Sequence, residues 1–164
     1  MDRNLDNLLK EFSNEFYEEF TNTFPALKYE YSPTAKYVIQ IQAPNKDFGD
    51  IKIAIGFRDI TVLIGEYYHT HFEQESSNGD TFDSMVRKQI IKDTIHFITE
   101  VISNKVLLRV EKRGEKLLSS SIEYVDQYKD KGYTTMIPLS GLLGKLFSKN
   151  KEIAFNTWSG VYKK

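Results

Sequence analysis

The chain has 164 residues with a net charge of −1; 40% are hydrophobic, and there are ten Tyr and eleven Phe but no Cys. This length suits one domain, the aromatic content argues against disorder, and the lack of Cys excludes disulfides, thiolate metal ligands and a cysteine nucleophile. We therefore expect a single domain over residues 1–164. The N-terminal stretch MDRNLDNLLKEF is charged throughout, and no run approaches the roughly 20 apolar residues of a membrane span. We expect no signal peptide, no membrane partner and a cytoplasmic location.

Two segments have the periodicity of amphipathic helices. Residues 4–23 place apolar side chains at three- and four-residue steps. Pro25 ends this segment, because proline lacks the amide proton of a helical hydrogen bond. Residues 81–104 carry a broad apolar arc, with His96 on the opposite, polar face. Each helix is expected to bury one face.

Short alternating runs predict β-strands. Before the second helix they are LKYEY, KYVIQIQA, IKIAIGFR and ITVLIGEYYHTHFE, with the segment QESSNGD as a turn. After it, KVLLRVE and EIAFNTWSGVY predict strands, RGEK a turn, GYTTMIP an extended segment and GLLGKLF a short helix, while SSIEYVDQY fits strand or helix. Residues 117–150 are thus not securely assigned. Short connections favour antiparallel pairing. The elements predict an α+β fold, in which a mostly antiparallel sheet of about five to six strands packs against two long helices.

The segment EYYHTHFE, residues 66–73, holds two of the three histidines. Residues two apart in a strand point to the same face, so His69, His71 and Glu73 are expected to project together from the less apolar side. Two imidazoles and a carboxylate are a ligand set for Zn, Fe, Mn or Ni. The same residues also suit a solvated strand end stacked with Tyr67, or a surface that contacts a partner.

The spacing is also similar to the H-x-H-x(3,4)-E element of cupins, with His69, His71 and Glu75 in the ligand positions. Leu63 and Phe82 stand where that element has glycines, and no second cupin element follows. The His-x-His pair with a carboxylate gives the alternative function, a metal-dependent enzyme in which the metal polarises a carbonyl or activates water. P-loop, dinucleotide-binding and G-x-S-x-G motifs are absent from the sequence.

Charge is distributed unevenly along the chain. Residues 1–104 hold 10 Lys and Arg against 17 Asp and Glu, a net charge of −7, whereas 105–164 hold 12 against 6, a net charge of +6. Residues 59–86 contain six acidic residues and no Lys or Arg. An acidic surface attracts cationic partners and repels nucleic acid. We expect a basic protein partner and no nucleic acid; the alternative is a solvated surface whose charge is balanced elsewhere in the fold.

Three stretches carry a family resemblance: the strand ending DITVLIGEYYHTHFE, the helix RKQIIKDTIHFITEVISNKVLL and the terminal NTWSGVY. They resemble small bacterial immunity proteins, the antidotes of polymorphic-toxin and contact-dependent growth inhibition systems. The resemblance implies a cytoplasmic protein without catalytic residues or cofactors, which binds one cognate toxin and neutralises it. Many such toxins are nucleases with cationic clefts, and an acidic surface with aromatic residues complements such a cleft.

The leading interpretation is therefore an immunity protein rather than an enzyme. Its expected toxin-binding residues lie in and after the histidine strand: Tyr67, His69, His71, Glu73, Glu75 and Asp80. In the alternative interpretation, a metal ion is held by His69, His71 and Glu73.

Overall fold

The computed structural model describes residues 3–33, 36–73, 82–126 and 151–162. Its helices are α1 (Arg3–Thr23) and α2 (Ser84–Ile102). Its strands are β1 (Glu30–Tyr31), β2 (Ile39–Ile41), β3 (Ile51–Ile55), β4 (Asp59–Ile64), β5 (Tyr68–Glu73), β6 (Val106–Arg113), β7 (Lys116–Tyr124), β8 (Lys151–Thr157) and β9 (Gly160–Val161). Both helices form where the apolar periodicity predicts them.

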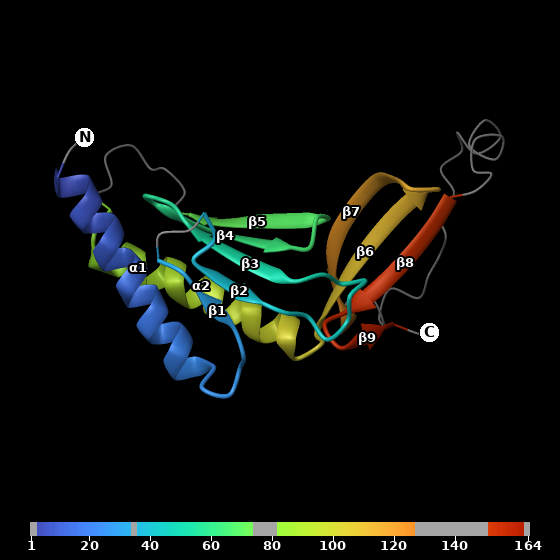
Figure 1. Ribbon diagram of the computed structural model, residues 1–164, viewed down its shortest axis with the longest axis horizontal. Coiled ribbons are helices and arrows are strands. Elements are labelled where there is room, and N and C mark those ends of the chain that lie inside the picture. Colours follow the sequence, from blue (N-terminus) through green and yellow to red (C-terminus); the bar gives the residue numbers. More distant parts are fainter. Residues whose placement is uncertain (1–2, 34–35, 74–81, 127–150, 163–164) are drawn as a thin grey trace.

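The five strands before α2 form one antiparallel sheet in chain order, β1-β2-β3-β4-β5, which we name sheet A (Figure 1). The prediction of one long strand through ITVLIGEYYHTHFE is wrong, because the chain turns back at residues 65–67 and β4 pairs with β5. Gly65 has φ of +54°. Glycine adopts this left-handed conformation without the steric penalty of other residues, so the turn forms there.

Strands β6 to β9 form a second antiparallel sheet, sheet B, in the order β7-β6-β8-β9. Sheet B stands beside sheet A, with β7 next to one end of β5 (Figure 1). The α+β class and the antiparallel pairing are confirmed, but the prediction of a single sheet is wrong, since the described strands divide into sheets of five and four. Alternating apolar residues predict which face a strand buries, but they do not predict which strand is its neighbour.

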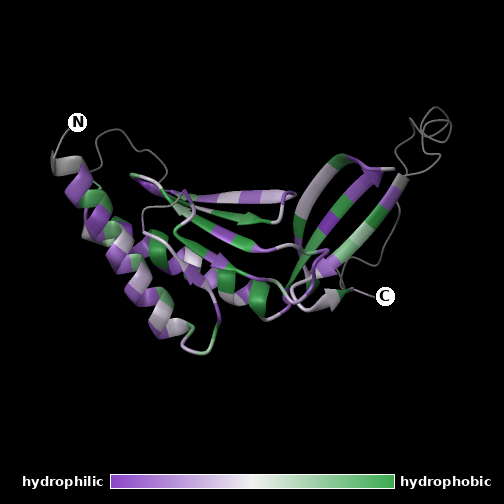
Figure 2. Ribbon diagram, viewed as in Figure 1, coloured by the Kyte–Doolittle hydropathy of each residue, from purple (hydrophilic) through white to green (hydrophobic). Residues whose placement is uncertain are grey.

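Both helices lie on the same side of sheet A and bury its apolar face (Figure 1). Phe12, Phe16 and Phe20 of α1 are fully buried, and hydrophobic and hydrophilic segments alternate along this helix (Figure 2). Asp83 caps α2, because its carboxylate accepts hydrogen bonds from the amides of Met85 and Val86 at 2.9 and 3.0 Å. The opposite face of sheet A carries no helix among the described residues.

One hydrophobic cluster joins the helices and both sheets, and it includes Val106, Leu108 and Trp158 from the sheet B part of the chain. The rings of Trp158 and Phe48 meet edge to face, with centroids 6.0 Å apart, at the junction of the two sheets. In the described parts of the chain, no helix has the length and apolar character that a membrane span needs.

The C-terminal predictions have mixed outcomes. SSIEYVDQY is a strand in β7 as far as Tyr124, RGEK is the turn before it, and EIAFNTWSGVY forms β8 and β9 with a turn between them. The segments QESSNGD, GYTTMIP and GLLGKLF lie outside the described residues.

Candidate functional site

The hairpin of β4 and β5 has two faces of opposite character. Its inward side chains face the hydrophobic core: those of β4 are fully buried, and Tyr68 and Phe72 of β5 pack against it. Its outward side chains form three cross-strand pairs: Asp59 with Glu73, Thr61 with His71, and Leu63 with His69. We name these six side chains the β4–β5 outer face. His69, His71 and Glu73 are exposed on it, which confirms that they project together.

A chain of hydrogen bonds fixes His71 on this face. Thr61 donates its hydroxyl proton to Oδ2 of Asp59 at 3.1 Å. Because a hydroxyl has one proton, the 2.9 Å contact between Oγ1 of Thr61 and Nδ1 of His71 assigns a proton to Nδ1. Oδ2 of Asp59 lies 3.6 Å from the same nitrogen. In the neutral ring, Nε2 of His71 then carries the lone pair and can accept a hydrogen bond from a partner.

The two strand histidines are close together but do not complete a metal site. The rings of His69 and His71 meet edge to face, with centroids 5.3 Å apart. Within the described residues, no group of three or more His, Asp or Glu side chains is arranged to hold a metal ion. Glu75 lies outside those residues. His96 is on the exposed side of α2, as predicted, 3.6 Å from Glu100. The metal-dependent enzyme stays a prediction.

Tyr67 lies in the turn between β4 and β5, and its contacts are with sheet B. The ammonium of Lys112 donates a hydrogen bond to the Tyr67 hydroxyl at 3.2 Å and lies 4.8 Å from the ring centroid. The hydroxyl of Ser120 donates to the backbone oxygen of Tyr67. The structure therefore places Tyr67 at the junction of the sheets rather than on the outer face. Asp80 lies outside the described residues.

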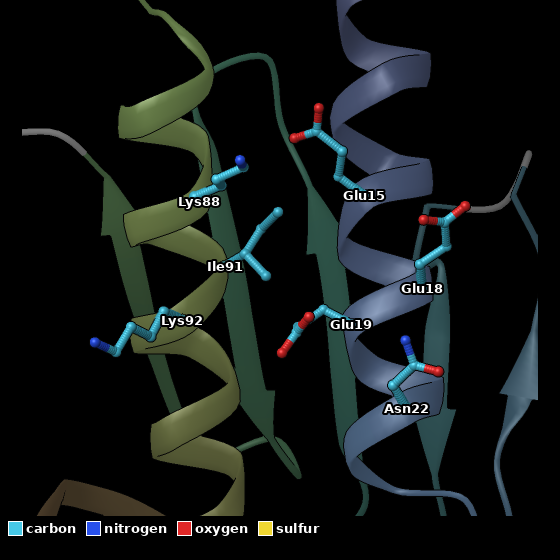
Figure 3. A pocket seen from close by; sticks show the side chains of 7 residues that line it. All are labelled: Glu15, Glu18, Glu19, Asn22, Lys88, Ile91 and Lys92. Atoms are coloured by element: carbon cyan, nitrogen blue, oxygen red, sulfur yellow. The ribbon is translucent and has the colours of Figure 1, made fainter.

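A second surface feature is a groove of about 390 Å³ between α1 and α2 (Figure 3). Its lining consists of Glu15, Glu18, Glu19 and Asn22 of α1 and Lys88, Ile91 and Lys92 of α2. Arg87 of α2 makes two hydrogen bonds to the Glu15 carboxylate, at 3.0 and 3.2 Å, and this contact raises the pKa of Arg87. The ion pair joins the helices. No hydrogen bond within the described residues positions the side chains of Lys88 and Lys92, so the two cations of the groove are not held in place for a ligand.

No family model, no characterised protein and no solved structure matches this chain. The function of the outer face is therefore argued from its geometry and its charge.

Strand periodicity did not indicate that Thr61 positions His71. The two residues are ten positions apart and meet only because β4 and β5 form a hairpin. The signal in the sequence is Gly65: a turn assigned there pairs Thr61 with His71 and Asp59 with Glu73.

Proposed function

We propose that this protein is an immunity protein, which binds a cationic toxin domain of a polymorphic-toxin or contact-dependent inhibition system through the β4–β5 outer face. The proposal depends above all on one observation: the carboxylate-bearing residues Asp59 and Glu73 are directly opposite each other across the two strands. Like charges in this position destabilise a sheet. A Lys or Arg of a partner placed between them removes the repulsion.

The outer face is also suited to binding because it is rigid. The backbone that carries it belongs to a hairpin whose other face is anchored in the core by Ile60, Val62 and Ile64, all fully buried. Contact residues on strands hold their positions better than contact residues on loops. Among the described residues no helix covers this side of sheet A, and the histidines on it are exposed.

The charge around the outer face supports a basic partner. No Lys or Arg occurs in residues 59–86, so nothing in that stretch neutralises Glu73 or the exposed Glu66 of the turn. Lys52 of β3 lies on the same face of sheet A, opposite Leu63, so the acidic charge is concentrated at the Asp59 and Glu73 end of the outer face. Charge there steers a basic protein during association and disfavours acidic partners. His71, with Nε2 as acceptor, adds a directional contact between the charges.

The first test is affinity capture from the native lysate with matched variants. Asp59→Asn combined with Glu73→Lys changes the net charge of the outer face by three units. Glu18→Lys combined with Glu19→Gln makes the same change on α1, on the opposite side of sheet A. We expect the wild type and the α1 variant to capture one basic protein, and the outer-face variant to lose it. A protein captured equally by all three, or an acidic partner, contradicts the proposal.

The toxin part of the proposal has a separate test. The captured protein, or its C-terminal domain, is expressed in a bacterial host with and without this chain. We expect growth arrest that the wild type relieves and the outer-face variant does not. A captured protein that leaves growth unaffected refutes the immunity function, even if the binding surface is correct.

A further inference from the structure

A polar pocket lies where the two sheets meet, away from the β4–β5 outer face. Its volume is about 260 Å³. The loop of residues 44–49 and the turn that carries Tyr67 form one side, and β6, β8 and β9 of sheet B form the other. Among the described residues, its polar lining consists of Asp47, Tyr67, Lys112, Glu152 and Asn156, and its aliphatic lining of Val110, Ala154 and Val161.

The loop side of the pocket is held by contacts to two other turns. The side-chain amide of Asn45 donates to the backbone oxygen of Thr157 at 3.1 Å, and its side-chain oxygen accepts from the amide of Asp47 at 3.1 Å. Gly49 and Gly65 touch backbone to backbone, since a Cβ on Gly49 would lie 2.5 Å from Cα of Gly65. These contacts fix the backbone on the loop side of the pocket.

Within the described part of the chain, Asn156 presents an unpaired side-chain amide to the pocket. It is only 4% exposed, yet none of the hydrogen bonds of the described residues involves its side-chain amide, and both amide atoms retain some accessible surface. Its side chain shares a face of sheet B with Ala154 and Glu152, which also line the pocket. Since solvent reaches these atoms, water can satisfy them in the free protein, and a polar ligand can replace that water.

Among the residues that the structure describes, the pocket has both a cation with free hydrogen-bond donors and carboxylates that are not in ion pairs. Lys112 has one of its three protons on the Tyr67 hydroxyl, so two donors remain. Asp47 and Glu152 take part in none of the ion pairs of the described residues. Glu152 is the cross-strand neighbour of Lys112. An anionic ligand is attracted by Lys112 but repelled by Asp47 and Glu152, and a cationic ligand meets the reverse.

We propose that this pocket binds a small zwitterion of the α-amino-acid type. Its ammonium group is matched by Asp47, Glu152 and the side-chain oxygen of Asn156. Its carboxylate is matched by Lys112 and the Tyr67 hydroxyl. The pocket volume of about 260 Å³ corresponds to roughly nine water-sized atoms at about 30 Å³ each, which is the size of a mid-sized amino acid. This site does not depend on the toxin-binding function.

The test is isothermal titration calorimetry on the full chain with the proteinogenic L-amino acids as probes. We expect one or a few of them to bind with Kd below about 1 mM. For the best binder, the N-acetyl derivative lacks the ammonium charge and the methyl ester lacks the carboxylate. Each is expected to bind about tenfold or more weakly, because each leaves charged groups of the lining unpaired. Failure of all probes to bind at about 10 mM, or equal binding of either derivative, overturns the proposal.

Asn156→Leu separates a binding role from a structural one. Leucine has a similar volume, and the amide that it replaces has no partner to lose, so we expect an unchanged or higher Tm together with about tenfold or more weaker binding. Asn22→Leu, on α1, is the control and should leave binding unchanged. An Asn156→Leu protein that binds the amino acid as the wild type does overturns the proposal. So does a Tm lowered by several degrees, since that shows a structural use of the amide.

Discussion

Gly49 packs against Gly65 where the loop of residues 44–49 meets the turn before β5. A Cβ on Gly49 would lie 2.5 Å from Cα of Gly65, well inside van der Waals contact, and Gly49 has φ of +84°. Gly49→Ala therefore combines a left-handed backbone penalty with a clash that only a backbone shift relieves. The two effects together predict a loss of about 2–5 kcal/mol in the free energy of unfolding. This is a large part of the stability of a typical domain, about 5–15 kcal/mol.

Gly114 provides the matched control, since it has φ of +57° but no atom within 4 Å of its Cβ position. Gly114→Ala thus measures the backbone penalty alone, about 1–2 kcal/mol. Both variants can be followed by urea unfolding through the fluorescence of Trp158, the single Trp of the chain, which contacts Phe48 of the same loop. If Gly49→Ala loses no more stability than Gly114→Ala, the close approach of the loop and the turn does not contribute to stability and the reasoning is wrong.

Three further predictions concern the helices, the alkaline limit of stability and metal ions. Glu15→Gln removes the hydrogen-bonded anionic partner of Arg87 and leaves only the more distant Glu11, at 4.0 Å. It should lower the free energy of unfolding by about 1–2 kcal/mol, whereas Glu18→Gln on the same helix should change it little. Equal effects in urea unfolding would show that the Arg87–Glu15 ion pair does not stabilise the helix pair. Burial, and then the Glu100 carboxylate, raise the pKa of Tyr124 above its ordinary value of 10.0. The neutral Tyr124 therefore contributes fully to the free energy of unfolding below pH 10.0, and this contribution is lost as the pH rises through the raised pKa. Tyr124→Phe should flatten the alkaline decline of the unfolding free energy, and an unchanged decline contradicts this. Excess Zn²⁺ should leave the Tm unchanged, because the described residues hold no three-ligand group; a rise of several degrees that His71→Ala abolishes would establish a metal site instead.

Strand and helix periodicity predicted a large part of the fold, because burial on one face leaves a regular pattern. The turn between β4 and β5 escaped this reasoning for a simple reason. Ile64 and Tyr68 pair with each other across the hairpin and are four positions apart, so the period of two continues through the turn as it does through an unbroken strand. Only Gly65 marks the break.

The division into two sheets and the pocket between them have no local signal. Tyr67 and Lys112 are 45 positions apart, and Asn156 reaches the same pocket from β8. Which strands pair is decided by the packing of the whole chain, and the alternation of residue types is the same for either arrangement. The common face of His69 and His71 was predictable, since it depends on neighbours in one strand.

The central claim is that a cationic protein binds at the β4–β5 outer face, and the affinity of the captured partner tests it most directly. The partner is titrated against the wild type, the Asp59→Asn/Glu73→Lys variant and the Glu18→Lys/Glu19→Gln variant at low and at physiological ionic strength. We predict that the outer-face variant binds about tenfold or more weakly and that its affinity depends less on salt, while the α1 variant binds as the wild type does. Equal affinities for both variants would contradict the claim, because the binding energy would then not depend on where the charge lies.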